Sequence, residues 1–152
     1  MIAIALAFHL LSAIIWVGGM FYAYMILRPV AANLLEPPVR LKLWSDIFRK
    51  FFVWVWAIII VIPVTGYFMI FTNWDGFSNL TIDIHIMHGL GILMILIYLH
   101  LYFAPYRRMN QALAEGNIQE AARRLSQMRI IVLINLLIGL TVATVASAGR
   151  YW

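Results

Sequence analysis

Four long apolar segments dominate the sequence and leave only one kind of fold open to it. A helix that crosses the hydrocarbon core of a bilayer needs about 20 predominantly apolar residues, and its backbone amides must be hydrogen-bonded within the protein. Four segments have this length: residues 2–27, 51–72, 84–104 and 130–148. With 64% hydrophobic and 11% charged residues, the chain could not bury its apolar side chains as a small water-soluble domain. We therefore predict an all-α integral membrane protein, a four-helix bundle forming a single domain over residues 1–152.

The basic residues predict how this bundle is oriented. The first and third connections hold most of them: Arg28, Arg40, Lys42, Arg49 and Lys50, then Arg107, Arg108, Arg123, Arg124 and Arg129. The second connection has none, and only Arg150 follows the last segment. Since cytoplasmic connections carry the excess of Lys and Arg, we expect both basic connections in the cytoplasm and both termini outside. The net charge of +5 then reflects the orientation of the chain in the membrane, and its basic residues are expected to contact membrane lipid. Nucleic acid is not an expected partner.

Both basic connections also contain helical patterns. Apolar residues recur at helical spacing through residues 37–51, with charged residues between them, which predicts an interfacial amphipathic helix. Residues 110–127 predict a second short cytoplasmic helix, broken near Gly116 and Asn117. These short helices would hold the bundle at the level of the lipid headgroups.

The candidate functional residues are histidines inside the predicted membrane segments. His9 lies in the first segment, and His85, His88 and His100 lie in the third. Ionisable side chains within a bilayer are unfavourable and usually mark functional sites. No carboxylate lies deep in any segment and the chain has no cysteine, so a carrier built on buried acids, a zinc–thiolate site or an iron–sulfur cluster is not expected.

Helix geometry relates these histidines to one another. At 1.5 Å per residue, His9 and His88 lie about 10 Å and 6 Å from the outer ends of their segments, whereas His100 lies about 18 Å deeper than His88. At 100° per residue, the three histidines of the third segment share about a third of the helix circumference, and we predict that this face looks into the bundle. Met20 lies on the same face as His9 and near the depth of His100.

Facing histidines without carboxylates or cysteines favour two chemistries. A b-type haem takes two axial imidazoles from different helices, and here these would be His9 and His88, with His85 as the alternative partner. A second, inner haem would lie near His100 and Met20. A copper site would instead use His85, Met87 and His88, because imidazole and thioether ligands suit Cu(I). A third interpretation is a structural subunit whose histidines only hydrogen-bond between helices.

Several strings of residues support a family resemblance. The first segment contains Ala7-Phe8-His9 and Trp16-Val17-Gly18-Gly19-Met20 and ends in Arg28-Pro29. The third has His88-Gly89-Leu90-Gly91, followed by Tyr102-Phe103-Ala104-Pro105-Tyr106-Arg107-Arg108. Arg129 directly precedes the fourth segment, and Asn135 and Gly139 lie within it. Across nearly the whole chain, this pattern resembles the copper-resistance D (CopD) superfamily.

The resemblance implies a function as well as a fold. The superfamily includes proteins assigned to copper uptake and the HemJ-type protoporphyrinogen oxidases, and it is similar in layout to four-helix transmembrane b-type cytochromes. The histidine that matches His9 is associated with haem in the HemJ type. This chain departs from that type, because His85 and His88 stand where a lysine is favoured, and Asn135-Leu136-Leu137-Ile138 replaces an Asn-Glu-x-Pro element.

These implications combine into one expectation with two alternatives. We expect a multi-pass protein of the bacterial inner membrane that binds haem b and carries out electron transfer or redox chemistry. A quinol or a redox protein would be its partner, and a homo-oligomer is compatible with the sequence. Copper import and a HemJ-like oxidase activity are the alternatives, so the sequence leaves open whether the protein is an enzyme, namely a membrane oxidoreductase.

Overall fold

The computed structural model describes residues 1–149, which form helices joined by short turns and contain no strand. The elements are, in order, α1 (Ile2–Phe21), η1 (Tyr22–Leu27), α2 (Arg28–Leu34), α3 (Pro37–Asn73), η2 (Phe77–Asn79), α4 (Ile82–Leu101), η3 (Tyr102–Tyr106), α5 (Arg107–Ala114) and α6 (Ile118–Ala148). Consecutive helical elements join into four rods long and apolar enough to cross a membrane: Ile2–Leu34, Pro37–Asn73, Ile82–Ala114 and Ile118–Ala148. The prediction of an all-α four-helix membrane bundle is confirmed.

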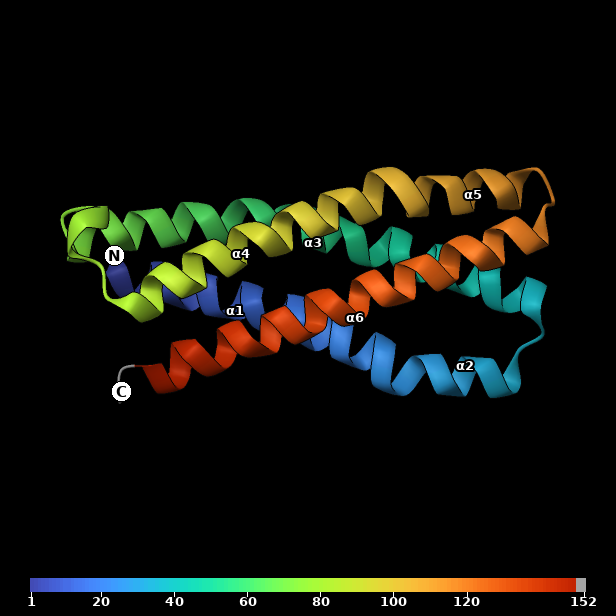
Figure 1. Cartoon of the computed structure of the whole chain (residues 1–152), viewed down its shortest axis with the longest axis horizontal. Coiled ribbons are helices and arrows are strands. Elements are labelled where there is room, and N and C mark those ends of the chain that lie inside the picture. The colour runs from blue at the N-terminus through green and yellow to red at the C-terminus, as the bar shows by residue number, and fades with distance from the viewer. Residues whose placement is uncertain (150–152) are drawn as a thin grey trace.

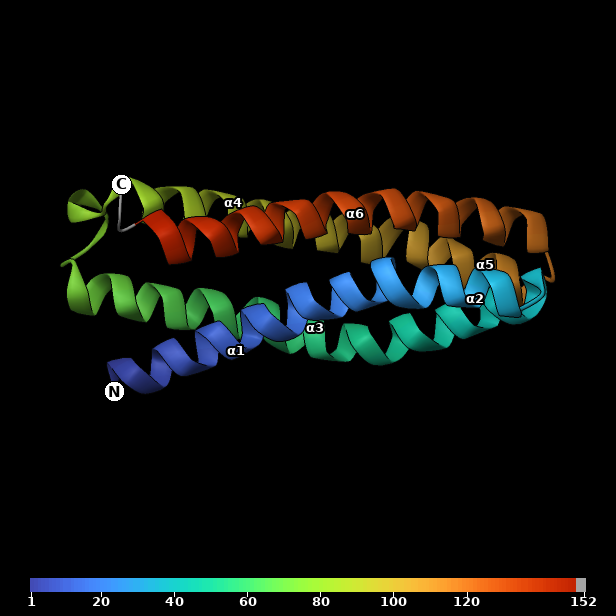
Figure 2. The same ribbon diagram turned by 90° about the horizontal axis from the view of Figure 1, so that it is seen from below.

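The four rods run up and down along one long axis (Figure 1). α1 packs along α3, and α4 packs along α6, so that each pair forms a hairpin-like unit; α1 and α4 are not among the closely packed pairs. Figure 2 shows α1 with α3 on one side and α4 with α6 on the other. The helix α1 begins, and the helix α6 ends, at the same end of the bundle.

The bundle can be divided across its long axis into two halves, a terminal half and a basic half. The terminal half contains residues 2–17, 58–73, 82–96 and 134–148. The basic half contains residues 18–57, 97–114 and 118–133, and it includes most of the Lys and Arg residues. The basic half extends well beyond a bilayer, because the 37 residues of α3 measure about 55 Å against about 30 Å of hydrocarbon.

The basic half differs from the sequence-based expectation in one respect. Residues 37–51 are not a separate interfacial helix but the first turns of α3, and residues 118–127 are likewise the first turns of α6. The physical reason is a buried stripe that runs without interruption through Trp44, Phe48 and Phe52 of α3. No helix-breaking residue separates these positions, so a single helix keeps both its backbone hydrogen bonds and its packing.

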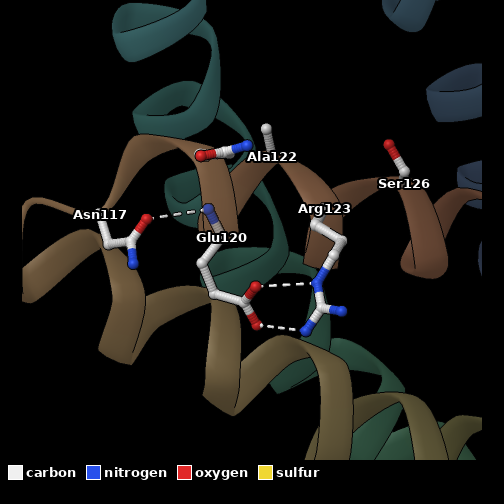
Figure 3. Close-up of a pocket in the computed structure, with 6 residues that line it drawn as sticks. Asn117, Glu120, Ala122, Arg123 and Ser126 are labelled. Atoms are coloured by element: carbon white, nitrogen blue, oxygen red, sulfur yellow. Dashed lines mark hydrogen bonds and ion pairs between the residues drawn. The ribbon is translucent and has the colours of Figure 1, made fainter.

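The predicted break near Gly116 and Asn117 is confirmed. Gly116 has a φ of 70°, a conformation that glycine adopts without strain, and it ends the segment of α5. The Asn117 side chain then accepts a hydrogen bond of 3.0 Å from the backbone N–H of Glu120 and so caps the start of α6 (Figure 3). The side chain of Glu120 in turn pairs with Arg123, at 2.8 Å between Oε2 and Nε.

Aromatic side chains fill the core of the basic half. Phe52 lies at the centre, with ring centroids 5.3 Å from Phe48, 5.4 Å from Tyr98 and 4.9 Å from Tyr106. Trp44 extends the cluster, 5.3 Å from Phe48. Stacked and edge-to-face aromatic pairs add about 0.5–1.5 kcal/mol each beyond their burial. The tightest packing of the molecule therefore lies in the basic half.

Two π-helical turns occupy matching places in the two hairpins. η1 separates α1 from α2, and η3 separates α4 from α5. Pro29 follows the first, and Pro105 lies within the second. Proline removes a backbone donor, and its ring clashes with the preceding turn of the helix. A widened turn next to the proline relieves this clash.

Candidate functional site

His9 projects from α1 toward α3 in the terminal half and is half-buried. Its Nδ1 lies 3.0 Å from the hydroxyl oxygen of Thr65. The Thr65 hydroxyl donates its one hydrogen to its own helix, where the carbonyl oxygen of Val61 lies at 2.6 Å. With that hydrogen used, the threonine oxygen can accept from His9, and this pairing corresponds to the tautomer with the proton on Nδ1 and the lone pair on Nε2. This is the tautomer of a histidine whose Nε2 coordinates a metal.

Glycine at position 66 allows this close approach of α1 to α3. A Cβ atom built on Gly66 would lie 3.3 Å from Cε1 of His9, which is tighter than ordinary contact. Any larger residue would press on the imidazole ring. The Thr65-Gly66 pair therefore both orients the His9 ring and leaves space for it.

His88 lies in the same half of the bundle, on α4, and is also half-buried. Its Nε2 is 3.1 Å from the hydroxyl of Tyr67 on α3. The ring of Phe77, from η2, lies 5.5 Å from the imidazole, so aromatic residues hold His88 on two sides. In contrast to His9, the nitrogen of His88 that most often coordinates a metal is engaged by a protein side chain.

The two histidines occupy corresponding places in the two hairpins. The rods that carry them, Ile2–Leu34 and Ile82–Ala114, have the same length of 33 residues and the same π-helical interruption. His9 lies seven residues after the start of α1, and His88 lies six residues after the start of α4. The bundle thus carries one imidazole at a similar level on each of two helices, α1 and α4, which touch through Trp16 and Tyr98 rather than packing along their length.

The prediction that the histidines of the third segment all face the bundle interior was wrong for two of them. His85 and His100 are exposed, and only His88 is half-buried. The buried residues of α4 are Met94, Tyr98 and Leu101, and His100 falls beside this stripe rather than on it. The helix angles give the relative positions of the histidines, but they do not show which face of α4 packs against the other helices.

Met20, which helix geometry places on the same face as His9, is buried and only 4% exposed. It packs within the same core cluster as the aromatic side chains of the basic half. His100 does not share this environment, so the two residues proposed for an inner haem do not face a common space. Met87, the thioether considered for copper, is half-buried near the start of α4.

Three polar residues that were not assigned as partners of the histidines line this part of the bundle. Thr65 and Tyr67 belong to α3, and they stand out in the sequence as polar groups in a long apolar segment. Asn135 on α6 is 4% exposed, and its Oδ1 has no hydrogen-bond partner within residues 1–149. A buried acceptor of this kind is unfavourable unless a donor reaches it.

The arrangement offers two separate imidazoles rather than a closed ion cage. Among the residues that the structure describes, no three His, Cys, Asp or Glu side chains come together. One imidazole is held with its Nε2 lone pair available, and the other is held by a tyrosine hydroxyl. Each imidazole could serve as a ligand to a metal, and the two lie on different helices.

The fold and these residues define a multi-pass membrane protein with intramembrane histidines. The chain belongs to the Copper resistance protein D (CopD) family, because the model of that family matches residues 45–148. The match includes α3, α4 and α6, and with them His88, Thr65 and Tyr67, whereas His9 precedes it. No curated protein and no solved structure matches the chain. Membership confirms the resemblance seen in the sequence and relates the protein to copper resistance.

Proposed function

We propose that this CopD-family protein binds haem b in the terminal half of its bundle and serves in electron transfer or redox chemistry in the bacterial inner membrane. His9 and His88 are the proposed axial ligands, with His85 as the alternative to His88. One observation carries the proposal: Thr65 holds His9 as the tautomer whose Nε2 can coordinate iron. A quinol or a redox protein is the proposed electron-transfer partner.

The residues fit a haem in chemistry, with one adjustment. Haem b needs two imidazoles, apolar walls and limited access of water, and the terminal half supplies these from its membrane-spanning helices. His9 requires no change of hydrogen bonding. His88 must release the Tyr67 hydroxyl before its Nε2 can serve as a ligand. The haem itself would supply the one-electron chemistry, while Thr65 and Gly66 position the ligand and the surrounding apolar side chains exclude water.

Copper binding is the second candidate, and family membership favours it. The first turns of α4 carry His85, Met87 and His88, a donor set that suits Cu(I). His85 is exposed near the end of the bundle, where an ion can approach from the aqueous side. In this interpretation copper is the cargo or substrate of the protein, and His9 has no direct part.

An absorption spectrum with metal analysis tests both candidates. We would purify the full chain in mild detergent after haem-replete expression, record oxidised and dithionite-reduced spectra, and measure iron and copper. The proposal predicts a sharp reduced α-band with stoichiometric iron. His9→Ala should abolish this band or convert the haem to high spin, whereas the exposed His100→Ala should leave it unchanged.

Other outcomes would reject the haem assignment. A low-spin spectrum that survives His9→Ala would remove His9 as a ligand. A colourless protein that holds copper, and loses it on His88→Ala, would establish the copper candidate instead. A protein free of both metals would leave the histidines as inter-helix hydrogen-bonding groups.

A further inference from the structure

A small cavity lies in the basic half, where the rod containing η1 and α2 meets α3 and α6. Its volume is about 20 Å³, which is room for one water-sized group. Most of its wall is aromatic or aliphatic and includes Tyr24, Trp44 and Phe48. Arg28 from α2 and Arg129 from α6 complete the lining. The cavity is therefore an apolar niche with two cations in its wall.

The arginines at this cavity have no acidic partner. The ion pairs within residues 1–149 join Asp46 to Arg49, and Glu120 to Arg123 and Arg124. None of them involves Arg28, Arg40 or Arg129. Arg28 and Arg40 lie close enough to Arg129 for their like charges to act on it. Three positive charges thus lie near one another, and no ion pair within residues 1–149 compensates them.

Neutral contacts hold two of these arginines in place. The guanidinium carbon of Arg28 lies 4.8 Å from the centroid of the Tyr24 ring, a cation–π contact. Nη1 of Arg40 donates to the carbonyl oxygen of Ala32 at 3.2 Å and so links α3 to α2. These contacts orient the side chains and leave their charges uncompensated.

Two buried donors at the same place lack an acceptor. Trp44 lines the cavity and is 4% exposed, yet its Nε1–H has no hydrogen-bond partner in the described part of the chain. The Nε–H of Arg129 is buried and unpartnered as well. A buried donor without an acceptor is unfavourable, so a ligand oxygen that reached these two groups would stabilise them.

We propose that this cluster binds the phosphate group of an anionic phospholipid at the opening of the cavity. The cavity has room for one phosphate oxygen, which would accept hydrogen bonds from Trp44 and Arg129, while Arg28 would pair with the oxygens outside it. Free phosphate shares the same charge chemistry, but the depth of the two arginines at the ends of membrane segments favours a phospholipid. Arg28 directly follows the first predicted membrane segment, and Arg129 directly precedes the fourth, which places both at headgroup depth. Basic pockets between helices on the cytoplasmic side are typical sites for anionic headgroups. The site is distinct from the histidines and does not depend on the proposed cofactor.

Native mass spectrometry of the full chain in detergent tests this proposal. Phosphatidylglycerol, phosphatidylcholine and inorganic phosphate would be added in separate titrations. We expect selective retention of phosphatidylglycerol and a loss of about tenfold or more in its affinity in the double variant Arg28→Gln/Arg129→Gln. The matched control Arg107→Gln/Arg108→Gln removes the same charge from exposed positions of the same half and should keep the affinity.

Further comparisons distinguish a phospholipid from free phosphate and separate loss of the site from misfolding. Arg28→Lys/Arg129→Lys keeps both charges and should retain most of the binding, so a loss confined to the Gln variant is a loss of the site. Equal losses in the site variant and the matched control would overturn the proposal in favour of diffuse attraction. Binding of inorganic phosphate but not of phosphatidylglycerol, dependent on Arg28 and Arg129, would overturn the lipid assignment.

Discussion

The basic and terminal halves are built from the same four rods but packed in different ways. The basic half contains most of the buried core, including the fully enclosed Val55, Met109 and Met128. In the terminal half, the contacts of the histidines are polar, and long stretches of α1 expose large apolar side chains to the surroundings. The protein therefore concentrates its packing away from His9 and His88.

Under the proposed function, this difference would let one small bundle combine stability with ligand binding. A site that must admit a large group cannot also be the most densely packed region, because close-packed cores leave no space. Aromatic packing in the basic half can hold the rods together while the terminal half adjusts to a ligand. If that is correct, equivalent substitutions in the two halves should have very different effects.

The largest effect is expected from Phe52→Ala. This change removes the central ring of the aromatic cluster and leaves a cavity against Phe48, Tyr98 and Tyr106, so the free energy of unfolding should fall by about 3–5 kcal/mol. Detergent-driven unfolding followed by circular dichroism measures it. Phe8→Ala, at a residue 56% exposed in the terminal half, should change stability by no more than about 0.5 kcal/mol. Similar values for the two variants would contradict the contrast between the halves.

A smaller effect is expected where α6 touches the other hairpin. A Cβ atom at Gly139 would lie 2.8 Å from Cγ2 of Val17 and 3.1 Å from Cε of Met94, so Gly139→Val should overpack this junction and cost about 1–3 kcal/mol. The same unfolding assay applies. Gly91→Val is the control, since its Cβ meets no atom within 4 Å. An equally large cost at Gly91 would show that helix propensity, rather than crowding, sets the effect.

A third substitution probes the hydrogen bond of His9. Thr65→Val removes the acceptor of the Nδ1 proton and should lower the free energy of unfolding by about 1 kcal/mol. It should also change the tautomer of His9, which ¹⁵N NMR of histidine-labelled protein reports directly. Thr72→Val, whose hydroxyl only donates to the Phe68 carbonyl, should leave the His9 signals unchanged. An unaltered His9 tautomer in Thr65→Val would remove the argument that Thr65 presets the ligand.

The smallest effect should be a pH dependence in the basic half. A hydrogen bond from Arg123, and a second from Arg124, lowers the pKa of Glu120 below its ordinary value of 4.5. A carboxylate with a lowered pKa in the folded state contributes stability that is present above the unfolded value and is lost as pH falls through the folded value. Acidification below about pH 4.5 should therefore reduce the melting temperature slightly.

The variant Glu120→Gln should weaken that acid-dependent decrease. Glu115→Gln is the matched control, because Glu115 accepts only from the amide of Gln111 and forms no ion pair among residues 1–149. If both variants retain the full acid dependence, another group is responsible for it.

The number and approximate extent of the membrane helices could be predicted from sequence because each depends on local composition. The break at Gly116 could be predicted for the same reason, since a single residue with positive φ causes it. The continuity of α3 through the basic connection was missed, because charged residues around Trp44 and Phe48 resemble an interfacial helix when the packing of the other rods is unknown. The tertiary environment, rather than local pattern, decides that outcome.

The orientation of the histidines was harder to predict for a physical reason. In a membrane helix, lipid-facing and buried residues are equally apolar, as Leu96 (exposed) and Met94 (buried) show on α4. Hydrophobic periodicity therefore does not reveal which face packs, and His85 and His100 were assigned to the wrong one. The hydrogen-bond partners of His9 and His88 depend on how α1 and α4 pack against α3, and local sequence patterns do not predict this packing.

The two π-helical turns also have a consequence for sequence comparison. A turn closed by a bond from residue i to i+5 contains one residue more than an α-helical turn, so it can lose that residue and remain helical. Homologues that differ in length within their membrane helices should therefore align with single-residue gaps at Tyr22–Leu27 or Tyr102–Tyr106. Because the wider turn still completes about one revolution, such a gap would leave the side chains of the basic half facing the same neighbours, so length changes at these two places would preserve the core.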